Sequence, residues 1–298
     1  MPRPRLRLPD RLPDRLAGRR RAVLKPPGLA DTAFWVHGPR DRYVSECLLA
    51  TGQMEPLETR VFCKLIRGST GFLDIGANLG YYTVLAQNLG PAGMTCVAVE
   101  PEKLNLRLLR RNVRPASGRV GVDVVPAAAS DRDGHTDLHL SPDNFGDHQT
   151  TPQPNRHRRS RRVATTTLAR LLARRPEIDF IKIDIQGAEP QVLGNPEAIA
   201  AMDRLGPECS VVFEFWPHAL DRSAAEKLAG LADTLGLHAF DIDEERRSVG
   251  RTDAEDLLGF YDLCRAGHAS RPFTNVFCTR SPQRTAWLEN NRRPLDSN

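Results

Sequence analysis

The feature that most constrains the fold is the stretch Gly71–Thr83, which reads GFLDIGANLGYYT. It begins with a short apolar run that contains Asp74, passes through Gly76 and Gly80, and ends in residues typical of a helix start. A strand that enters a helix through a glycine-containing turn is where α/β proteins bring a small ligand close to the backbone. The sequence therefore predicts an α/β sheet with a ligand at the carboxyl end of this strand.

The spacing of the glycines excludes two common ligands. A dinucleotide loop has the pattern Gly-x-Gly-x-x-Gly, but Asn78 and Tyr81 occupy the second and third glycine positions. A triphosphate loop needs Gly-Lys-Ser/Thr, and no such tripeptide follows. What remains, Gly-x-Asn-x-Gly after a strand acid, resembles the opening of class I S-adenosylmethionine methyltransferases. A glycine-rich helix start that binds no ligand is the alternative.

A second motif, Thr95–Pro101, reads TCVAVEP and forms a short strand-like run that ends in Glu100. An acid at the tip of the second strand, about twenty residues after the glycine loop, can accept both hydroxyls of a ribose. Glu100 followed by Pro101 also suits the start of a helix, and the two interpretations are compatible. Dinucleotide enzymes share this acid, so only the glycine spacing separates the two cofactor classes.

Strand-like and helix-like segments alternate along the chain. We expect strands at 34–37, 72–75, 95–99, 122–125, 135–140, 178–183, 210–215, 237–241 and 274–279. We expect helices at 43–49, 57–66, 79–89, 103–113, 168–173, around 228–235 and at 252–264. This alternation predicts a doubly wound, mostly parallel, Rossmann-like sheet. Because no long helix is expected after Asn275, the C-terminal strand should form an antiparallel edge.

Composition and cysteine usage indicate a soluble enzyme. The 298 residues, 40% of them hydrophobic, can form one large α/β core with a small cap. Six scattered cysteines without a Cys-x-x-Cys pair indicate reduced thiols and neither a disulfide framework nor a zinc site. No apolar run approaches membrane-spanning length, and a signal-peptide core is lacking. We therefore expect a cytoplasmic protein without a membrane partner.

The positive charge is concentrated at the N-terminus. Residues 1–25 carry a formal charge of +7, whereas the rest of the chain carries −2, within a total of +5. Prolines every few residues oppose a long helix there. We expect residues 1–25 to be solvated, disordered and dispensable for the fold, and we do not expect nucleic acid as a partner.

The stretch Ile178–Glu189, IDFIKIDIQGAE, points to a family. Together with four other signatures it resembles the FkbM-type methyltransferases over roughly residues 34–280. The other signatures are Gly52-x-x-Glu55-Pro56, Asp74-Ile-Gly-Ala-Asn-x-Gly-Tyr81, Val99-Glu-Pro101 and Phe273-Thr-Asn-Val-Phe277. Two positions depart from the usual family pattern, because Gln186 and Ala169 stand where acids are common. The first departure weakens any metal site built on that acid.

The resemblance implies methyl transfer from S-adenosyl-L-methionine to a hydroxyl of a natural product, sugar or lipid-like small molecule. The residues that it places around the cofactor are Glu55, Asp74, Gly76, Ala77, Asn78, Gly80, Tyr81, Glu100, Pro101, Ala128 and Asp184. Because the methyl group is already activated, alignment of the reactants contributes most, about 7–11 kcal/mol. A general base adds about a hundred- to ten-thousandfold.

Three residues at the carboxyl ends of expected strands could act as that base. They are the catalytic candidates Asp184, Glu214 and His218. His218 can titrate near neutral pH, although a surface histidine fits the same Trp-Pro-His loop. Asp184 and Glu189 could chelate a divalent ion, but Gln186 occupies the place of a further acid, so we expect no metal.

The polar segment 141–162 contains five arginines and Phe145 and has the length of a lid or of a disordered loop. Its arginines favour an anionic or carrier-bound small-molecule acceptor. Two other functions stay open, a methyltransferase acting on RNA or protein and a non-catalytic S-adenosylmethionine-binding module. Nucleic-acid methyltransferases of this fold usually carry an Asn/Asp-Pro-Pro-Tyr motif, and Asp184-Ile-Gln-Gly stands there instead.

Four segments are expected. They are a basic, disordered tail (1–28), an N-terminal cap on the substrate side (29–68), the methyltransferase domain (69–280) and a C-terminal tail (281–298). The sequence makes no prediction of the oligomeric state.

Overall fold

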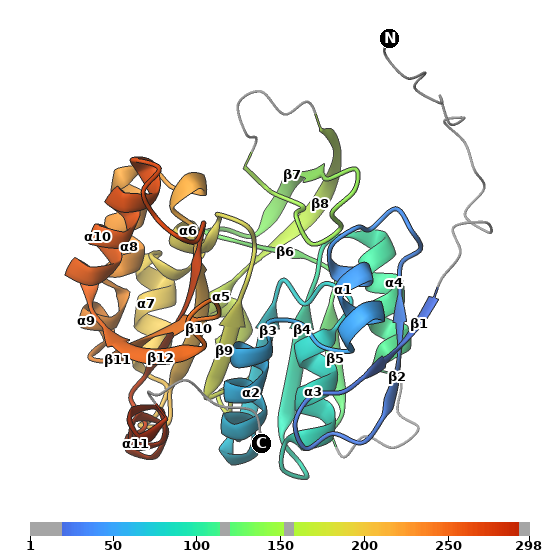
Figure 1. Cartoon of the computed structure of the whole chain (residues 1–298), viewed down its shortest axis with the longest axis horizontal. Helices are drawn as coiled ribbons and strands as arrows, with labels where there is room; N and C mark the ends of the chain where they lie inside the picture. The colour runs from blue at the N-terminus through green and yellow to red at the C-terminus, as the bar shows by residue number, and fades with distance from the viewer. Residues whose placement is uncertain (1–19, 114–119, 152–157, 292–298) are drawn as a thin grey trace.

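A computed structural model of the chain describes residues 20–113, 120–151 and 158–291 (Figure 1). Its centre is an eight-stranded sheet with the order β12-β11-β13-β10-β9-β3-β4-β5. The strands are β3 (Gly71–Ile75), β4 (Thr95–Val99), β5 (Val122–Val125), β9 (Phe180–Ile183), β10 (Ser210–Phe215), β11 (His238–Asp243), β12 (Ser248–Thr252) and β13 (Thr274–Thr279). The predicted α/β fold class is confirmed.

The parallel part of the sheet runs from β10 through β9, β3 and β4 to β5. The other end is antiparallel, because β13 pairs antiparallel with both β10 and β11, and β12 pairs antiparallel with β11. An antiparallel edge is therefore present, as predicted. Its outermost strand is β12, while the C-terminal strand β13 lies inside the sheet.

Helices cover both faces of the sheet. One face carries α2 (Pro56–Leu65), α3 (Tyr81–Leu89), α4 (Lys103–Asn112) and α11 (Pro282–Asn290). The opposite face carries α5 (Leu168–Ala173), α6 (Glu189–Leu193), α7 (Pro196–Asp203), α8 (Arg222–Ala229), α9 (Leu231–Leu235) and α10 (Ala254–Arg265). Side chains alternate between the two faces along each strand. In β9, Ile181 and Ile183 pack in the second core, whereas Phe180 packs in the first and Lys182 shares its face.

The N-terminal cap includes residues that were expected to be a tail. β1 (Arg20–Leu24) pairs antiparallel with β2 (Thr32–Val36), and α1 (Val44–Thr51) packs beside them. The Leu24 side chain is fully buried in the first core. The expectation of a disordered tail through residue 28 is therefore wrong from residue 20 onward, and its earlier part lies outside the described residues.

The cap strand gives a testable prediction about truncation. A chain that starts at Pro26 lacks β1 and should unfold at lower denaturant concentration than one that starts at Arg20. Burial of Leu24 alone is worth about 1.5–3 kcal/mol, so we expect a stability loss of at least about 2 kcal/mol. Urea unfolding of the two truncations measures the difference. Equal midpoints would show that β1 contributes nothing to the fold.

A second, three-stranded sheet covers one end of the central strands, at the top of Figure 1. It contains β6 (Ala128–Ser130), β8 (Arg159–Thr167) and β7 (Gly134–Leu140), in that order. The strand predicted at 135–140 is present as β7. The arginine-rich part of the expected lid is different, because residues 159–162 belong to β8 and Arg161 forms an ion pair with Glu102 at 3.3 Å.

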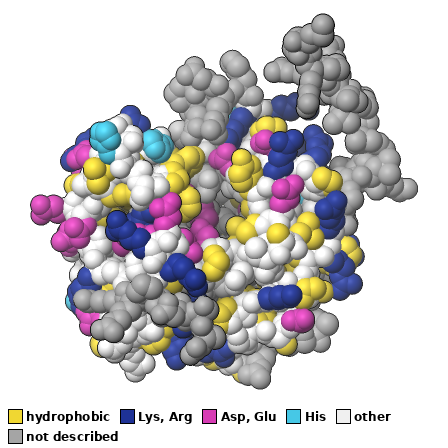
Figure 2. Space-filling view, in the orientation of Figure 1, with side chains coloured by type: hydrophobic (Ala, Val, Ile, Leu, Met, Phe, Trp, Pro, Cys, Tyr) yellow, Lys and Arg dark blue, Asp and Glu magenta, His cyan; other side chains and the backbone are white. Residues whose placement is uncertain are grey.

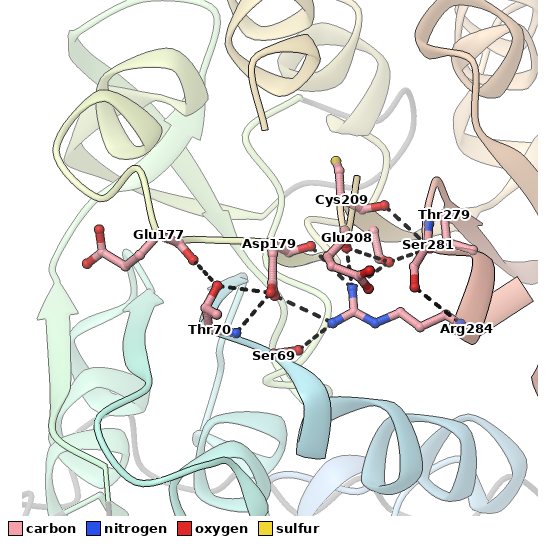
Figure 3. Close-up of polar contacts among 10 residues, drawn as sticks. Ser69, Thr70, Glu177, Asp179, Glu208, Cys209, Thr279, Ser281 and Arg284 are labelled. Atoms are coloured by element: carbon pink, nitrogen blue, oxygen red, sulfur yellow. Dashed lines mark hydrogen bonds and ion pairs between the residues drawn. The ribbon is translucent and has the colours of Figure 1, made fainter. Parts of the chain in front are cut away.

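The expected C-terminal tail, 281–298, is also a structured element through α11 (Figure 3). Arg284 of this helix is buried, and its guanidinium donates to the Ser69 hydroxyl at 2.7 Å and forms an ion pair with Asp179 at 3.5 Å. These contacts bind the helix beneath the amino end of β9. The C-terminal tail prediction is therefore wrong as far as residue 290. No described helix is long and apolar enough to cross a membrane.

Candidate functional site

The glycine loop between β3 and α3 lies between the ends of two neighbouring strands. Gly76, Asn78 and Gly80 all have positive φ angles, of 82°, 52° and 86°. A Cβ atom on Gly76 would lie 1.9 Å from the carbonyl oxygen of Asp184, at the end of β9. On the other side, the amides of Gly76 and Ala77 donate to the Val99 carbonyl at 2.9 and 3.0 Å. Only glycine at position 76 allows this close approach of backbone to backbone.

Glu100 lies at the tip of β4, as predicted, and is linked to the glycine loop. Its carboxylate accepts the Asn78 amide at 2.9 Å and the Glu102 amide at 2.7 Å. The side chain is buried, and this burial raises the pKa of Glu100 to about 7 despite the two hydrogen bonds. The loop and the acid therefore form one preformed unit.

A small cavity opens beside this unit. Six of the residues expected around the cofactor line it, namely Gly76, Asn78, Glu100, Pro101, Ala128 and Asp184. Asn78 lines it, and its side-chain oxygen is buried and has no hydrogen-bond partner among the described residues. Such an orphan acceptor in a cavity is a place where a ligand donor can bind.

The other five expected residues, Glu55, Asp74, Ala77, Gly80 and Tyr81, do not line this cavity. Asp74 accepts a hydrogen bond from the Thr83 hydroxyl at 2.5 Å, and burial raises its pKa to about 6. The Tyr81 hydroxyl lies 3.1 Å from the Thr59 hydroxyl. Gly80 packs against Leu109, where a Cβ would lie 2.5 Å from Cδ1. These residues therefore support the glycine loop without lining the cavity.

The segment that follows β7, between residues 145 and 150, lines the cavity. The Phe145 carbonyl accepts the side-chain amides of Asn78 at 3.3 Å and Asn105 at 3.0 Å, and the Phe145 amide donates to Asp41 at 3.2 Å. His148 also lines the cavity, and burial lowers its pKa to about 4, so its ring is neutral. Sequence reasoning named Phe145 only as part of a lid. The signal that could have identified it as a cavity residue is that it is an aromatic residue within a polar stretch.

A cluster of buried acids with one lysine lies beside the cavity, under α2. The Lys182 ammonium pairs with Glu58 at 3.0 Å and lies 3.9 Å from Asp184. Glu55 begins α2 and accepts hydrogen bonds from Tyr82 at 3.1 Å and from Asn275 at 3.2 Å. Burial is the main cause that raises the pKa of Glu58, and it raises that of Glu55 to about 7.

Acidic side chains reach the surface at the centre of the face shown in Figure 2. Asp184, Glu189 and Glu214 each offer a carboxylate oxygen, and these atoms lie within 4.8 Å of one another. Both oxygens of Glu189, however, already accept backbone amides, from Ile185 at 2.7 Å and Gly187 at 2.8 Å. Glu189 therefore shapes the turn after β9, and we assign no metal to this cluster.

Gln186 connects the first cavity to a second, larger one. Its side-chain amide donates to Asp184 at 2.7 Å and to Glu214 at 3.3 Å. Asp184 lines the first cavity, Glu214 lines the second and Gln186 lines both. The residue that departs from the family pattern thus marks the junction of the two cavities.

Glu214 is half-buried at the end of β10. Burial, followed by the nearby charges of Asp184 and Glu189, raises its pKa well above the usual value. His218, the third catalytic candidate, is exposed in the short 3-10 turn Pro217–Ala219 and lines neither cavity. The structure therefore brings Asp184 and Glu214 together and leaves His218 outside. Trp216, which the sequence analysis did not select, is the residue of this turn region that lines the second cavity.

Solved structures with a similar chain path include three methyltransferases. A precorrin-6y C5,15-methyltransferase of Geobacter metallireducens is 16% identical, with 74% of this chain and 86% of that chain covered and a TM-score of 0.38. An O-methyltransferase of Bacillus cereus in complex with SAH is 13% identical, with 79% and 86% covered and a TM-score of 0.35. The O-methyltransferase TomG of Streptomyces achromogenes in complex with SAM is 12% identical, with 81% and 87% covered and a TM-score of 0.37.

No curated protein matches the chain. A family model, the methyltransferase FkbM domain, matches residues 74–234, which is more than half of the chain. The matched segment begins at Asp74 and includes the glycine loop, Glu100, the Asp184 turn and Glu214.

Proposed function

The chain belongs to the FkbM methyltransferase family, whose members use S-adenosyl-L-methionine, and we propose that it methylates a hydroxyl group of a small natural-product, sugar or lipid-like molecule. The observation that carries this proposal is the junction at Gln186. There a cavity built on the glycine loop meets a second cavity, with two carboxyl groups held at the boundary. Such an arrangement suits a methyl donor in one cavity and a methyl acceptor in the other, because the two must be aligned where the cavities meet.

The residues that line the first cavity suit the cofactor. Gly76 allows the glycine loop to approach the Asp184 carbonyl closely, and Asn78 has a buried side-chain oxygen that could accept a hydrogen bond from the ligand. Glu100 would accept the ribose hydroxyls, because each carboxylate oxygen can accept more than one hydrogen bond. Ala128, from β6, leaves room for a flat ring. When bound, the cofactor supplies a methyl group already activated by its positive sulfur.

The two carboxyl groups have different tasks in this proposal. Asp184 receives the hydroxyl proton as the acceptor oxygen takes the methyl group, because it lines the cofactor cavity. Gln186 orients this carboxylate through its 2.7 Å hydrogen bond. Burial and the neighbouring carboxylates raise the pKa of Glu214, and in its protonated form Glu214 can donate a hydrogen bond to the acceptor.

These roles predict distinct kinetic effects. Asp184→Asn should lower kcat by about a hundredfold or more, with a much smaller change in the affinity for S-adenosylhomocysteine. Glu214→Gln should mainly raise KM for the acceptor. His218→Ala is the matched control, because it removes a titratable group from the same end of the sheet without touching either cavity.

The measurement pairs calorimetric titration with S-adenosylhomocysteine and the rate of its release in the presence of hydroxylated acceptors. Mass spectrometry and NMR of the product then locate the new methyl group. A methyl group found on nitrogen or carbon would overturn O-methylation. A full rate for Asp184→Asn would remove Asp184 from the role of proton acceptor.

A further inference from the structure

Aromatic side chains from three distant segments meet around the second cavity. They are Tyr43 before α1, Trp216 after β10 and Phe273 before β13. Tyr43 is 61% exposed, although it is a large hydrophobic residue. Aromatic residues with one apolar face and one wet edge are favoured at binding surfaces. Their flat faces match the C–H faces of a sugar ring.

Polar groups that can both donate and accept hydrogen bonds alternate with these rings. The segment from Ser141 to Asp147 contributes a hydroxyl, an amide and carboxylates to the cavity wall, and Gln186 and Glu214 close it at the junction. Asn144 is held in place because its side-chain oxygen accepts the Gly146 amide at 3.1 Å. A ring that carries several hydroxyls needs this mixture, since each hydroxyl both donates and accepts.

The charge of the cavity disfavours an anionic acceptor. Arg158 is the one cation among the described residues that line it, and its side chain is only 7% exposed. Its guanidinium is paired with Asp147 at 2.5 Å, so its charge is already neutralised. Among the described residues of the wall, the charge then left is that of the Asp143 carboxylate. A phosphate or carboxylate would meet this wall without a free partner.

We propose that the second cavity binds a neutral sugar ring, so that the methyl acceptor is a ring hydroxyl of an uncharged carbohydrate or glycoside. This inference rests on the proposed function and specifies its substrate. It replaces the expectation of an anionic or carrier-bound acceptor, which the arginine-rich segment suggested. The hydroxyl that faces Gln186 and Glu214 is the one that is methylated.

Matched sugars test the charge of the acceptor. The probes are the methyl glycosides of glucose, galactose and mannose, each beside its uronic acid and its 2-amino counterpart. Saturation-transfer NMR and the quenching of tryptophan fluorescence, both with S-adenosylhomocysteine present, report binding. At least one neutral glycoside should bind about tenfold more tightly than its uronic acid, a difference of about 1.4 kcal/mol.

Two substitutions test whether the neutral glycoside binds in the second cavity. Trp216→Ala should weaken binding of the neutral glycoside by about tenfold or more while the affinity for S-adenosylhomocysteine stays unchanged. His218→Ala, two residues further along the same turn, should leave both affinities unchanged. Unchanged sugar binding in Trp216→Ala, or preferential binding of the uronic acid or amino sugar, would overturn the proposal.

Two further outcomes separate this inference from the function on which it rests. Methyl transfer to hydroxylated lipids or aromatic alcohols without any sugar binding would overturn the carbohydrate acceptor and leave O-methyltransfer standing. Absence of S-adenosylhomocysteine binding in the folded protein would overturn the proposed function itself.

Discussion

Gly76→Ala is expected to abolish binding of S-adenosylhomocysteine and with it all methyl transfer. The added Cβ would lie 1.9 Å from the Asp184 carbonyl oxygen, so the loop or the end of β9 must move. Either movement separates the loop from the strand end that together line the cofactor cavity. We expect the dissociation constant to rise by more than about a hundredfold, the effect of losing about 2.7 kcal/mol.

Gly93→Ala is the matched control for this change. Gly93 has a φ of 84°, against 82° for Gly76, and a Cβ there would meet nothing within 4 Å. Both variants therefore carry the same left-handed backbone strain, about 1–2 kcal/mol, and only one carries the clash. Calorimetry and urea unfolding of both variants separate lost binding from lost stability. Equal affinities in the two variants would show that the close contact at Asp184 is not needed.

Lys182→Met should give the largest loss of stability of any single change in the acid cluster. The Lys182 and Glu58 side chains are 4% and 3% exposed, and they pair at 3.0 Å. Removing the cation leaves Glu58 buried beside Glu55 and Asp184 without compensation. Breaking one side of a buried ion pair typically destabilises a protein by about 3–5 kcal/mol, and we expect a loss in that range.

The double variant Lys182→Met/Glu58→Gln tests the reason for that loss. If the cost comes from an unpaired buried carboxylate, removing that charge as well should restore most of the stability. Urea unfolding of the wild type and of the single and double variants completes the thermodynamic cycle. A single variant within about 1 kcal/mol of the wild type would mean that the ion pair contributes little.

That several residues lining the first cavity lie together could be predicted from the sequence because they come from short local segments. The turn around Gly76 and the strand end at Glu100 each have a pattern of residues and spacing that backbone geometry requires. Their meeting follows from the parallel pairing of β3 with β4. The supporting roles of Asp74 and Tyr81 could not be predicted, since spacing does not tell which face of the loop a side chain takes.

The second cavity could not be predicted for a different reason. Tyr43, Trp216 and Phe273 are far apart in the sequence, and no local pattern connects them. That Trp216 lines the second cavity while His218 lies outside both cavities could not be predicted, because the direction of a side chain in a turn depends on backbone angles that spacing does not reveal. Apolar and polar residues alternate along β1, with Ala22 and Leu24 facing inward, which is the pattern of a strand. The high arginine content of the N-terminus nevertheless led to the prediction of a disordered tail.

The position of β13 inside the sheet has a consequence for how the chain folds while the ribosome makes it. Chains are made from the N-terminus, and β13 separates two strands made before it, β10 and β11 (Figure 1). Until β13 has been made, the backbone amides and carbonyls along one edge of β10 have no partner strand. Such an open edge can pair with strands of other chains. Phe273, just before β13, joins the wall of the second cavity in the same step. A chain that stops between β12 and β13 therefore exposes this edge of β10 and lacks one aromatic wall of the second cavity.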